Sequence, residues 1–135
     1  MQLAEVEGAR VHNVDHLWRP AGGILYLAGP YTHPDSEVRK RRYIAITDVA
    51  AQLVARGHIV FSPLTMTHPI DRVLAREHET LGSDYWVKFD ESFMEVCADI
   101  VVFMLDGWQF SAGVQREVLY FSERKRPVYF LDPQL

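Results

Sequence analysis

Residues 100–105 read Ile100-Val101-Val102-Phe103-Met104-Leu105, and Asp106-Gly107 end this apolar run. A run rich in β-branched residues and without polar alternation is typical of a strand that helices cover on both faces. Shorter apolar runs at residues 24–28, 58–61 and 128–131 have the same character. The sequence therefore predicts that these four segments are strands of a mainly parallel sheet.

The segments between these strands have helical features. Asp35 or Ser36 can cap a helix whose apolar residues recur at helical spacing until Gly57. Pro69 suits the first turn of a second, short helix. Helices are predicted over residues 36–56, 69–78, 83–97 and 112–124, with a loop over 62–68 before the second. Strands that alternate with helices predict a three-layer α/β sandwich, Rossmann/flavodoxin-like in class.

The first 23 residues show no sustained period, and Gly22 and Gly23 interrupt the end of this stretch. We expect an N-terminal arm over residues 1–23 and one α/β domain over residues 24–135. The total of 135 residues fits a single domain.

Composition limits the function classes. The formal net charge of −4 gives no basic field for a nucleic acid polymer, and no apolar run approaches the ~20 residues of a membrane helix. The single Cys97 cannot form an internal disulfide, as expected in a reducing cytoplasm. The six histidines lack metal-ligand spacing, and neither G-x-G-x-x-G nor a P-loop occurs. We expect a cytoplasmic protein without metal, cofactor or membrane contact.

Three segments follow strands at the edge where ligands bind in parallel sheets: residues 29–34, 62–68 and 106–113. Each carries small or hydroxyl side chains near a predicted helix start, which favours an anion. This feature is common to α/β domains and predicts a pocket rather than a particular reaction.

Glu117 and Asp90 each share a helix face with apolar residues. Glu117 lies three residues after Val114 and four before Phe121, and a carboxylate buried there would need compensation. Spacing alone leaves two interpretations for both acids: a functional carboxylate facing a pocket, or a polar residue at the edge of the apolar stripe.

The other candidates also have an ordinary structural interpretation beside a role in the pocket. Tyr26 fits the core of its strand, His68 fits a loop histidine with a local hydrogen bond, and Ser111 fits a helix N-cap. The run at residues 39–42 is either a solvated basic face or a source of one arginine, Arg42, that reaches an anionic substrate.

These residues together resemble a known superfamily. Tyr26-Leu27-Ala28-Gly29-Pro30, the acid Asp90 and Ser111-Ala112-Gly113-Val114-Gln115-Arg116-Glu117 resemble the nucleoside 2-deoxyribosyltransferases. They resemble even more closely the related 2′-deoxynucleoside 5′-monophosphate N-glycosidases. Segments 64–70 and 107–113 resemble a group of small bacterial members of the superfamily without an assigned function. The resemblance covers residues 24–131.

The resemblance implies residue roles. Glu117 matches the nucleophile, Tyr26 the tyrosine that contacts it, and Asp90 the acid that serves the departing base. Glu91 fits that acid within one residue, and Asp90 is preferred for its apolar face. Ser111 stands where the transferases have an acid, which favours a 5′-phosphate. The expected substrate-binding residues are Gly29, Pro30, Tyr31, Arg42, His68, Ser111 and Gly113.

The resemblance thus implies cleavage of the N-glycosidic bond of a nucleoside 5′-monophosphate, by a protein that pairs as a homodimer. Two other functions stay open. One is a deoxyribosyltransferase that acts on free nucleosides. The other is a nucleotide-binding or sensing module that uses the same fold without catalysis.

Overall fold

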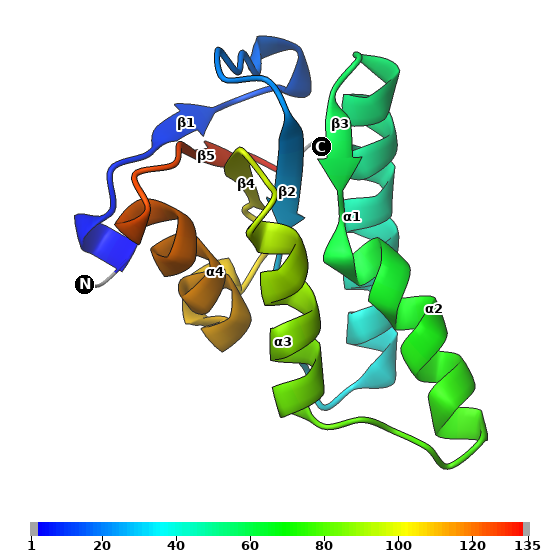
Figure 1. Ribbon diagram of the computed structural model, residues 1–135. Helices are drawn as coiled ribbons and strands as arrows, with labels where there is room; N and C mark the ends of the chain where they lie inside the picture. The colour runs from blue at the N-terminus through cyan, green and yellow to red at the C-terminus, as the bar shows by residue number, and fades with distance from the viewer. Residues whose placement is uncertain (1–2, 134–135) are drawn as a thin grey trace.

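A computed structural model describes residues 3–133 and places five strands of this part of the chain in one sheet (Figure 1). The order across the sheet is β1-β5-β4-β2-β3, and every neighbouring pair is parallel. The strands are β1 (Ala9–Val11), β2 (Ile24–Ala28), β3 (Ile59–Phe61), β4 (Asp99–Phe103) and β5 (Val128–Leu131). The predicted strands and the parallel α/β class are confirmed.

Helices cover both faces of the sheet, which confirms the predicted three layers (Figure 1). α1 covers one face together with α2 at its side, and α3 and α4 lie over the other face. Their bounds are α1 (Ser36–Ala55), α2 (Pro63–Arg76), α3 (Ser83–Met94) and α4 (Ala112–Glu123). Short 3-10 turns occur at Leu3–Glu5, Val14–His16 and Trp108–Phe110. Among the described residues, no helix combines the length and apolar character needed to cross a membrane.

Side chains along β2 alternate between the hydrophobic cores on the two faces of the sheet. Leu25 and Leu27 point to the face that α1 covers, while Tyr26 and Ala28 point to the opposite face, beneath α3 and α4. All four side chains are buried. The strand thereby directs a tyrosine toward α4.

The strand order reverses at β2. From β2 the chain passes through α1 to β3 on one side, and it later enters β4 on the other side. Tyr26 is in register with Ile100, and Ala28 with Val102. The segments that follow β2 and β4 therefore diverge from one edge, and ligands bind at such a switch point in open α/β sheets.

The segment expected as an arm contributes to the sheet. β1 pairs with the edge of β5, with Ala9 opposite Tyr129. Val11, Val14 and Leu17 are buried in the core that α1 covers. The strand has three residues, of which two are exposed, so it produces neither an apolar run nor a measurable alternation in the sequence.

The loop expected over residues 62–68 is wrong, because α2 already begins at Pro63. Pro63 occupies the first turn, where a proline costs no hydrogen bond, and Pro69 lies inside the helix. The Thr65 hydroxyl is 2.8 Å from both the Ser62 and the Thr47 hydroxyls. Two prolines six residues apart both suit a helix start, and in the structure the earlier one, Pro63, occupies it.

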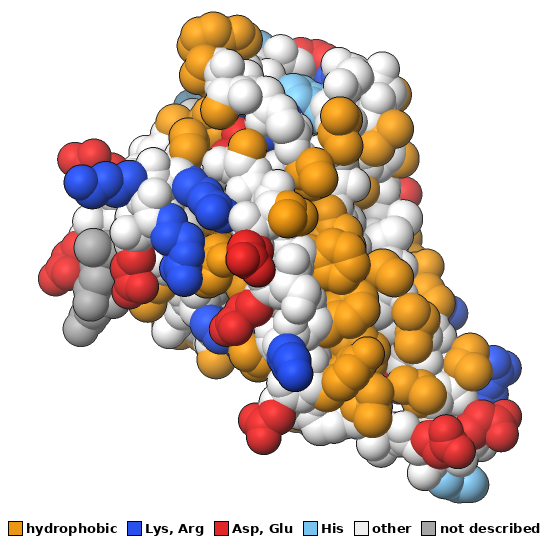
Figure 2. Space-filling view, in the orientation of Figure 1, with side chains coloured by type: hydrophobic (Ala, Val, Ile, Leu, Met, Phe, Trp, Pro, Cys, Tyr) orange, Lys and Arg blue, Asp and Glu red, His pale blue; other side chains and the backbone are white. Residues whose placement is uncertain are grey.

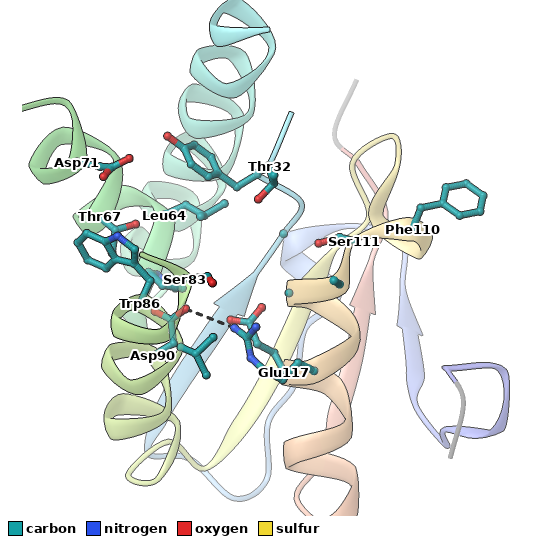
Figure 3. Close-up of a pocket in the computed structure, with 17 residues that line it drawn as sticks. Thr32, Leu64, Thr67, Asp71, Ser83, Trp86, Asp90, Phe110, Ser111 and Glu117 are labelled. Carbon is teal, nitrogen blue, oxygen red and sulfur yellow. Dashed lines mark ion pairs between the residues drawn. The ribbon is translucent and has the colours of Figure 1, made fainter. Parts of the chain in front are cut away.

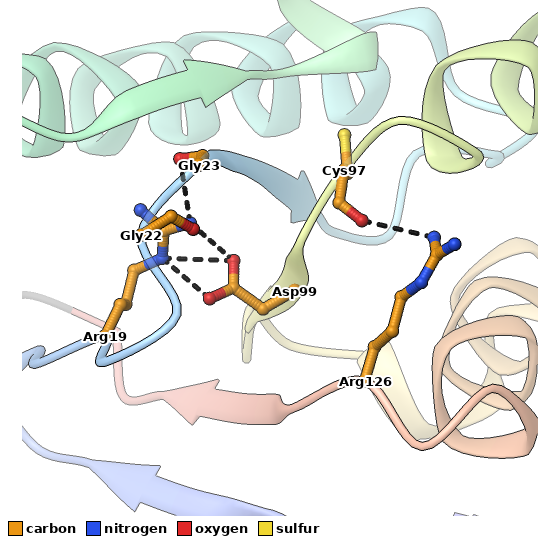
Figure 4. Close-up of polar contacts among 6 residues, drawn as sticks. All are labelled: Arg19, Gly22, Gly23, Cys97, Asp99 and Arg126. Carbon is orange, nitrogen blue, oxygen red and sulfur yellow. Dashed lines mark hydrogen bonds and ion pairs between the residues drawn. The ribbon is translucent and has the colours of Figure 1, made fainter.

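A buried ion pair joins the N-terminal segment to β4. The Arg19 guanidinium donates to Asp99 at 2.7 and 2.9 Å and to the carbonyls of Gly22 and Gly23 at 2.9 and 3.0 Å (Figure 4). The side chains of Arg19 and Asp99 are 4% and 0% exposed. Asp99 is the first residue of the central strand β4, so this pair fixes where the segment before β2 meets the sheet.

Arg19→Met should destabilise the protein by ~3–5 kcal/mol, because it leaves the Asp99 carboxylate buried without its partner. Urea unfolding measures the change. Arg10→Met is the matched control, since Arg10 pairs with Asp132 at 2.9 Å on a side chain that is 66% exposed, and exposed pairs contribute about 1 kcal/mol or less. Equal losses in the two variants would contradict the assigned importance of the buried pair.

Candidate active site

A cavity of about 590 Å³ opens at the carboxyl edge of β2 and β4. Its walls come from α2 and α3 on one side and from the N-terminal half of α4 on the other (Figure 3). This is the place that the strand reversal predicts. The volume lies in the range of small-molecule sites.

At the base of the cavity, the Tyr26 hydroxyl donates a hydrogen bond to Glu117 Oε2. Tyr26 is fully buried on β2, and Glu117 is 6% exposed on the inner face of α4. Burial excludes the interpretation of Glu117 as a polar residue at the edge of the apolar stripe, because its side chain does not extend to solvent. Sequence positions 91 residues apart meet because β2 directs Tyr26 toward α4.

Burial controls the protonation of this pair. The pKa of Glu117 is raised to about 8, chiefly by desolvation; the Tyr26 hydrogen bond and Arg116 oppose this rise, and the nearby Asp90 contributes to it. Burial also raises the pKa of Tyr26 well above its ordinary value, so Tyr26 remains a hydrogen-bond donor. Glu117 is therefore a carboxyl group that changes charge near neutral pH.

Asp90 projects from α3 into the same cavity, opposite α4 (Figure 3). Its Oδ2 lies 3.9 Å from Arg116 Nη2. Burial raises the pKa of Asp90 to about 6, and Arg116 limits the rise. Glu91 is exposed and does not line the cavity, so the structure supports the preference for Asp90 over Glu91 by position.

Two buried polar atoms beside this pair, Asp90 Oδ1 and Arg116 Nε, have no hydrogen-bond partner among the described residues. Such atoms cost stability, and in native proteins they often mark a functional site. Here they lie on both sides of the cavity floor.

The start of α4 forms a second wall. Ser111 is the N-cap, as predicted, and its hydroxyl accepts a hydrogen bond from the Val114 N–H at 3.2 Å. Ser111, Ala112 and Gly113 line the cavity. The first amides of a helix lack intrahelical acceptors and lie at its positive end, so this wall favours an anionic group.

The segment after β2 forms the rim. Gly29 and Tyr31 line the cavity, whereas Pro30 is buried and does not. A Cβ at Gly29 would lie 2.8 Å from Ile46 Cδ1, so a larger residue there would displace the end of the Ile46 side chain on α1. Gly29 thus allows the end of β2 to pack closely against α1.

The structure does not bring Arg42 or His68 to the cavity wall. The Arg42 guanidinium donates to the carbonyls of Thr32 at 3.1 Å and Asp106 at 3.3 Å, and thereby joins the segments after β2 and β4. His68 is buried within α2, where Nδ1 lies 2.6 Å from the Tyr31 hydroxyl. Both residues thus hold the segment after β2, which forms the rim of the cavity.

Sequence reasoning missed several lining residues. Trp86 lines the cavity one helical turn before Asp90, and Asp71 and Thr67 line it from α2 (Figure 3). Arg116 directly precedes Glu117 in the motif but received no role. The four-residue spacing of Trp86 and Asp90 was a usable signal. Thr67 fell in the segment mistaken for a loop, whereas Asp71 lay in the predicted helix without a signal that it faces the cavity.

No group of three His, Cys, Asp or Glu side chains suited to a metal ion occurs within residues 3–133. Exposed apolar side chains gather over α2 and α3 beside the cavity (Figure 2); they include Met66, Ile70, Val73, Leu81 and Tyr85. The homodimer stays a prediction, and pairing over this surface would bury these side chains.

Glu117→Gln should change how stability depends on pH. An acid whose pKa is about 8 when folded and about 4.5 when unfolded stabilises the folded state most below pH 4.5. That contribution is lost as the pH rises to 8. The free energy of unfolding of the original protein should therefore fall relative to the Gln variant over this range, by a few kcal/mol.

Urea unfolding at half-unit pH steps measures this difference, with Glu91→Gln as the exposed control. If the free energy of unfolding depends on pH in the same way in the original protein and in Glu117→Gln, Glu117 is ionised at ordinary pH. That result would contradict the assigned effect of burial on its pKa.

Comparison with protein-family models places most of this chain in a known family. The model of a domain of unknown function, DUF1937, matches residues 23–132. These residues include β2 to β5 and every residue named above in the cavity wall. A comparison with curated proteins finds no match. The chain, with its parallel α/β sheet and the cavity at its switch point, belongs to the DUF1937 family.

Proposed function

We propose that this protein is an N-glycosidase that releases the base from a nucleoside or 2′-deoxynucleoside 5′-monophosphate. One observation carries the proposal: the buried Glu117 carboxyl, held by the Tyr26 hydroxyl, faces a cavity with a second acid, Asp90, on the opposite wall. Glycosidases act with two carboxyl groups on either side of the bond that breaks. The resemblance to the nucleotide N-glycosidases agrees with this arrangement.

Glu117 acts as the nucleophile. The Tyr26 hydrogen bond fixes Oε2, and Oε1 attacks C1′ of the sugar. A C1′–O bond forms as the C1′–N bond breaks, and the bonding electrons leave with the base. Water then displaces Glu117 from C1′ and gives its proton to the Asp90 carboxylate, which yields the sugar 5-phosphate, the free Glu117 carboxylate and protonated Asp90.

Asp90 acts as the general acid that protonates the departing base, a step worth ~10²–10⁴ in rate. With pKa values of about 8 for Glu117 and about 6 for Asp90, the resting protein at pH 7 holds its proton on Glu117. The reactive form holds it on Asp90. In both forms the pair of acids carries one proton. The singly protonated pair is most abundant between these two pKa values, so activity is greatest there.

The walls fit the rest of a nucleotide. Trp86 lies one turn from Asp90 on α3 and offers an aromatic face to the base that Asp90 protonates. The amides of Ala112 and Gly113 with the Ser111 hydroxyl suit the 5′-phosphate. Arg42 contributes positive charge at this edge while its donors hold two backbone carbonyls.

Incubation with ribo- and deoxyribonucleoside 5′-monophosphates and the matching nucleosides should release free base from the monophosphates. Chromatography detects the base. Glu117→Gln should lower the rate at least ~10³-fold, because it removes the nucleophile and keeps the shape. Glu91→Gln, which changes the exposed acid next to Asp90, should retain the activity.

The outcomes separate the three functions. Base release from free nucleosides that increases with a second base and is lost with a 5′-phosphate indicates a deoxyribosyltransferase. A rise in melting temperature with a nucleotide, but no base release from any substrate, indicates a binding module. Full activity in folded Glu117→Gln would contradict the proposed nucleophile.

A further inference from the structure

A second cavity, of about 400 Å³, lies beside the first, between the start of α1 and the second half of α2. Tyr31 and Asp71 line both cavities and form the partition between them. Three arginines line the second cavity: Arg39 on α1, and Arg72 and Arg76 on α2. We call it the arginine pocket.

Arg72 and Arg76 lie four residues apart, so they share one face of α2. Within residues 3–133, neither forms an ion pair or a side-chain hydrogen bond. Other arginines of the chain are engaged with acids or backbone carbonyls: Arg10, Arg19, Arg42, Arg56, Arg116, Arg124 and Arg126. Two arginines that line a cavity thus keep all their donors.

The third arginine of the pocket is held in place by hydrogen bonds, and the pocket carries little negative charge. Arg39 Nη1 donates to the carbonyls of His33 and Pro34, which holds that guanidinium in place. Asp71 is the single carboxylate among the lining residues, so three positive charges face one negative charge. Burial lowers the pKa of His68, and Arg72 lowers it further, so His68 adds no charge near neutral pH.

We propose that the arginine pocket binds a phosphate group, at a site separate from Glu117. A guanidinium offers paired N–H donors that match two phosphate oxygens. Arg72 and Arg76 supply free donors, and Arg39 adds a fixed charge from a second helix. The phosphate comes either from a further phosphate on a nucleotide that occupies the neighbouring cavity or from a separate phosphorylated molecule.

The test is calorimetric titration with inorganic phosphate and pyrophosphate at constant ionic strength. Arg72→Gln/Arg76→Gln should weaken binding at least ~10-fold, since each charge-assisted bond contributes about this factor or more. Arg41→Gln/Lys88→Gln removes the same charge from exposed positions outside both cavities and should bind as the original protein does. Equal affinity in all three proteins, or no binding to the original protein, would overturn the proposal.

Titration of Glu117→Gln with 2′-deoxyadenosine 5′-monophosphate and 5′-triphosphate distinguishes the two sources of phosphate. If the triphosphate binds more tightly and Arg72→Gln/Arg76→Gln removes the difference, the phosphate belongs to the nucleotide. If the two nucleotides bind alike while pyrophosphate binding depends on the arginines, the ligand is a separate molecule. This proposal does not depend on Glu117 as a nucleophile, so a failure to detect base release leaves it standing.

Discussion

Glu117 has to be almost free of water and still face a substrate, and the hydrogen bond from Tyr26 makes this possible. Burying an ionised carboxylate costs several kcal/mol, and a donor on the neighbouring strand offsets part of that cost. The bond requires that β2 directs Tyr26 to the α4 face and that α4 begins at the same edge of the sheet. The Ser111 cap sets the start of α4, the helix that carries Glu117 to this contact.

Charged groups lie both at the floor of the cavity and around it. The two titratable acids lie at the floor of the cavity, where burial raises the pKa of each. Arg116 lies beside them, 3.9 Å from Asp90. Further positive groups lie around the floor: the start of α4 on one side and the arginine pocket beyond Tyr31 on the other. A nucleotide has the complementary pattern, with an uncharged glycosidic bond and phosphates at one end. This complementarity supports a nucleotide over a free nucleoside as the substrate.

The strands after residue 23 could be predicted because each is an apolar run with clear ends, and Ser111 and Asp35 follow ordinary capping chemistry. β1 could not be predicted, because two of its three residues are exposed at the sheet edge. Glu117, Tyr26 and Asp90 were identified as candidates by motif and spacing, but spacing could not decide whether either acid was buried. Trp86 was missed although its four-residue spacing from Asp90 was a usable signal. Arg116 and the α2 wall were missed, because nothing in their own segments indicates which residues face a cavity shared with other elements.

The most direct test of this account is mass spectrometry of the protein, acid-quenched at early times during reaction with the best 2′-deoxynucleoside 5′-monophosphate. The account predicts a mass increase of one deoxyribose 5-phosphate unit, located by peptide mapping on Glu117 and absent from Glu117→Gln. Base release with an unmodified Glu117 peptide at every time point, or an adduct on another residue, would contradict the claim that the buried Glu117 carboxyl is the nucleophile.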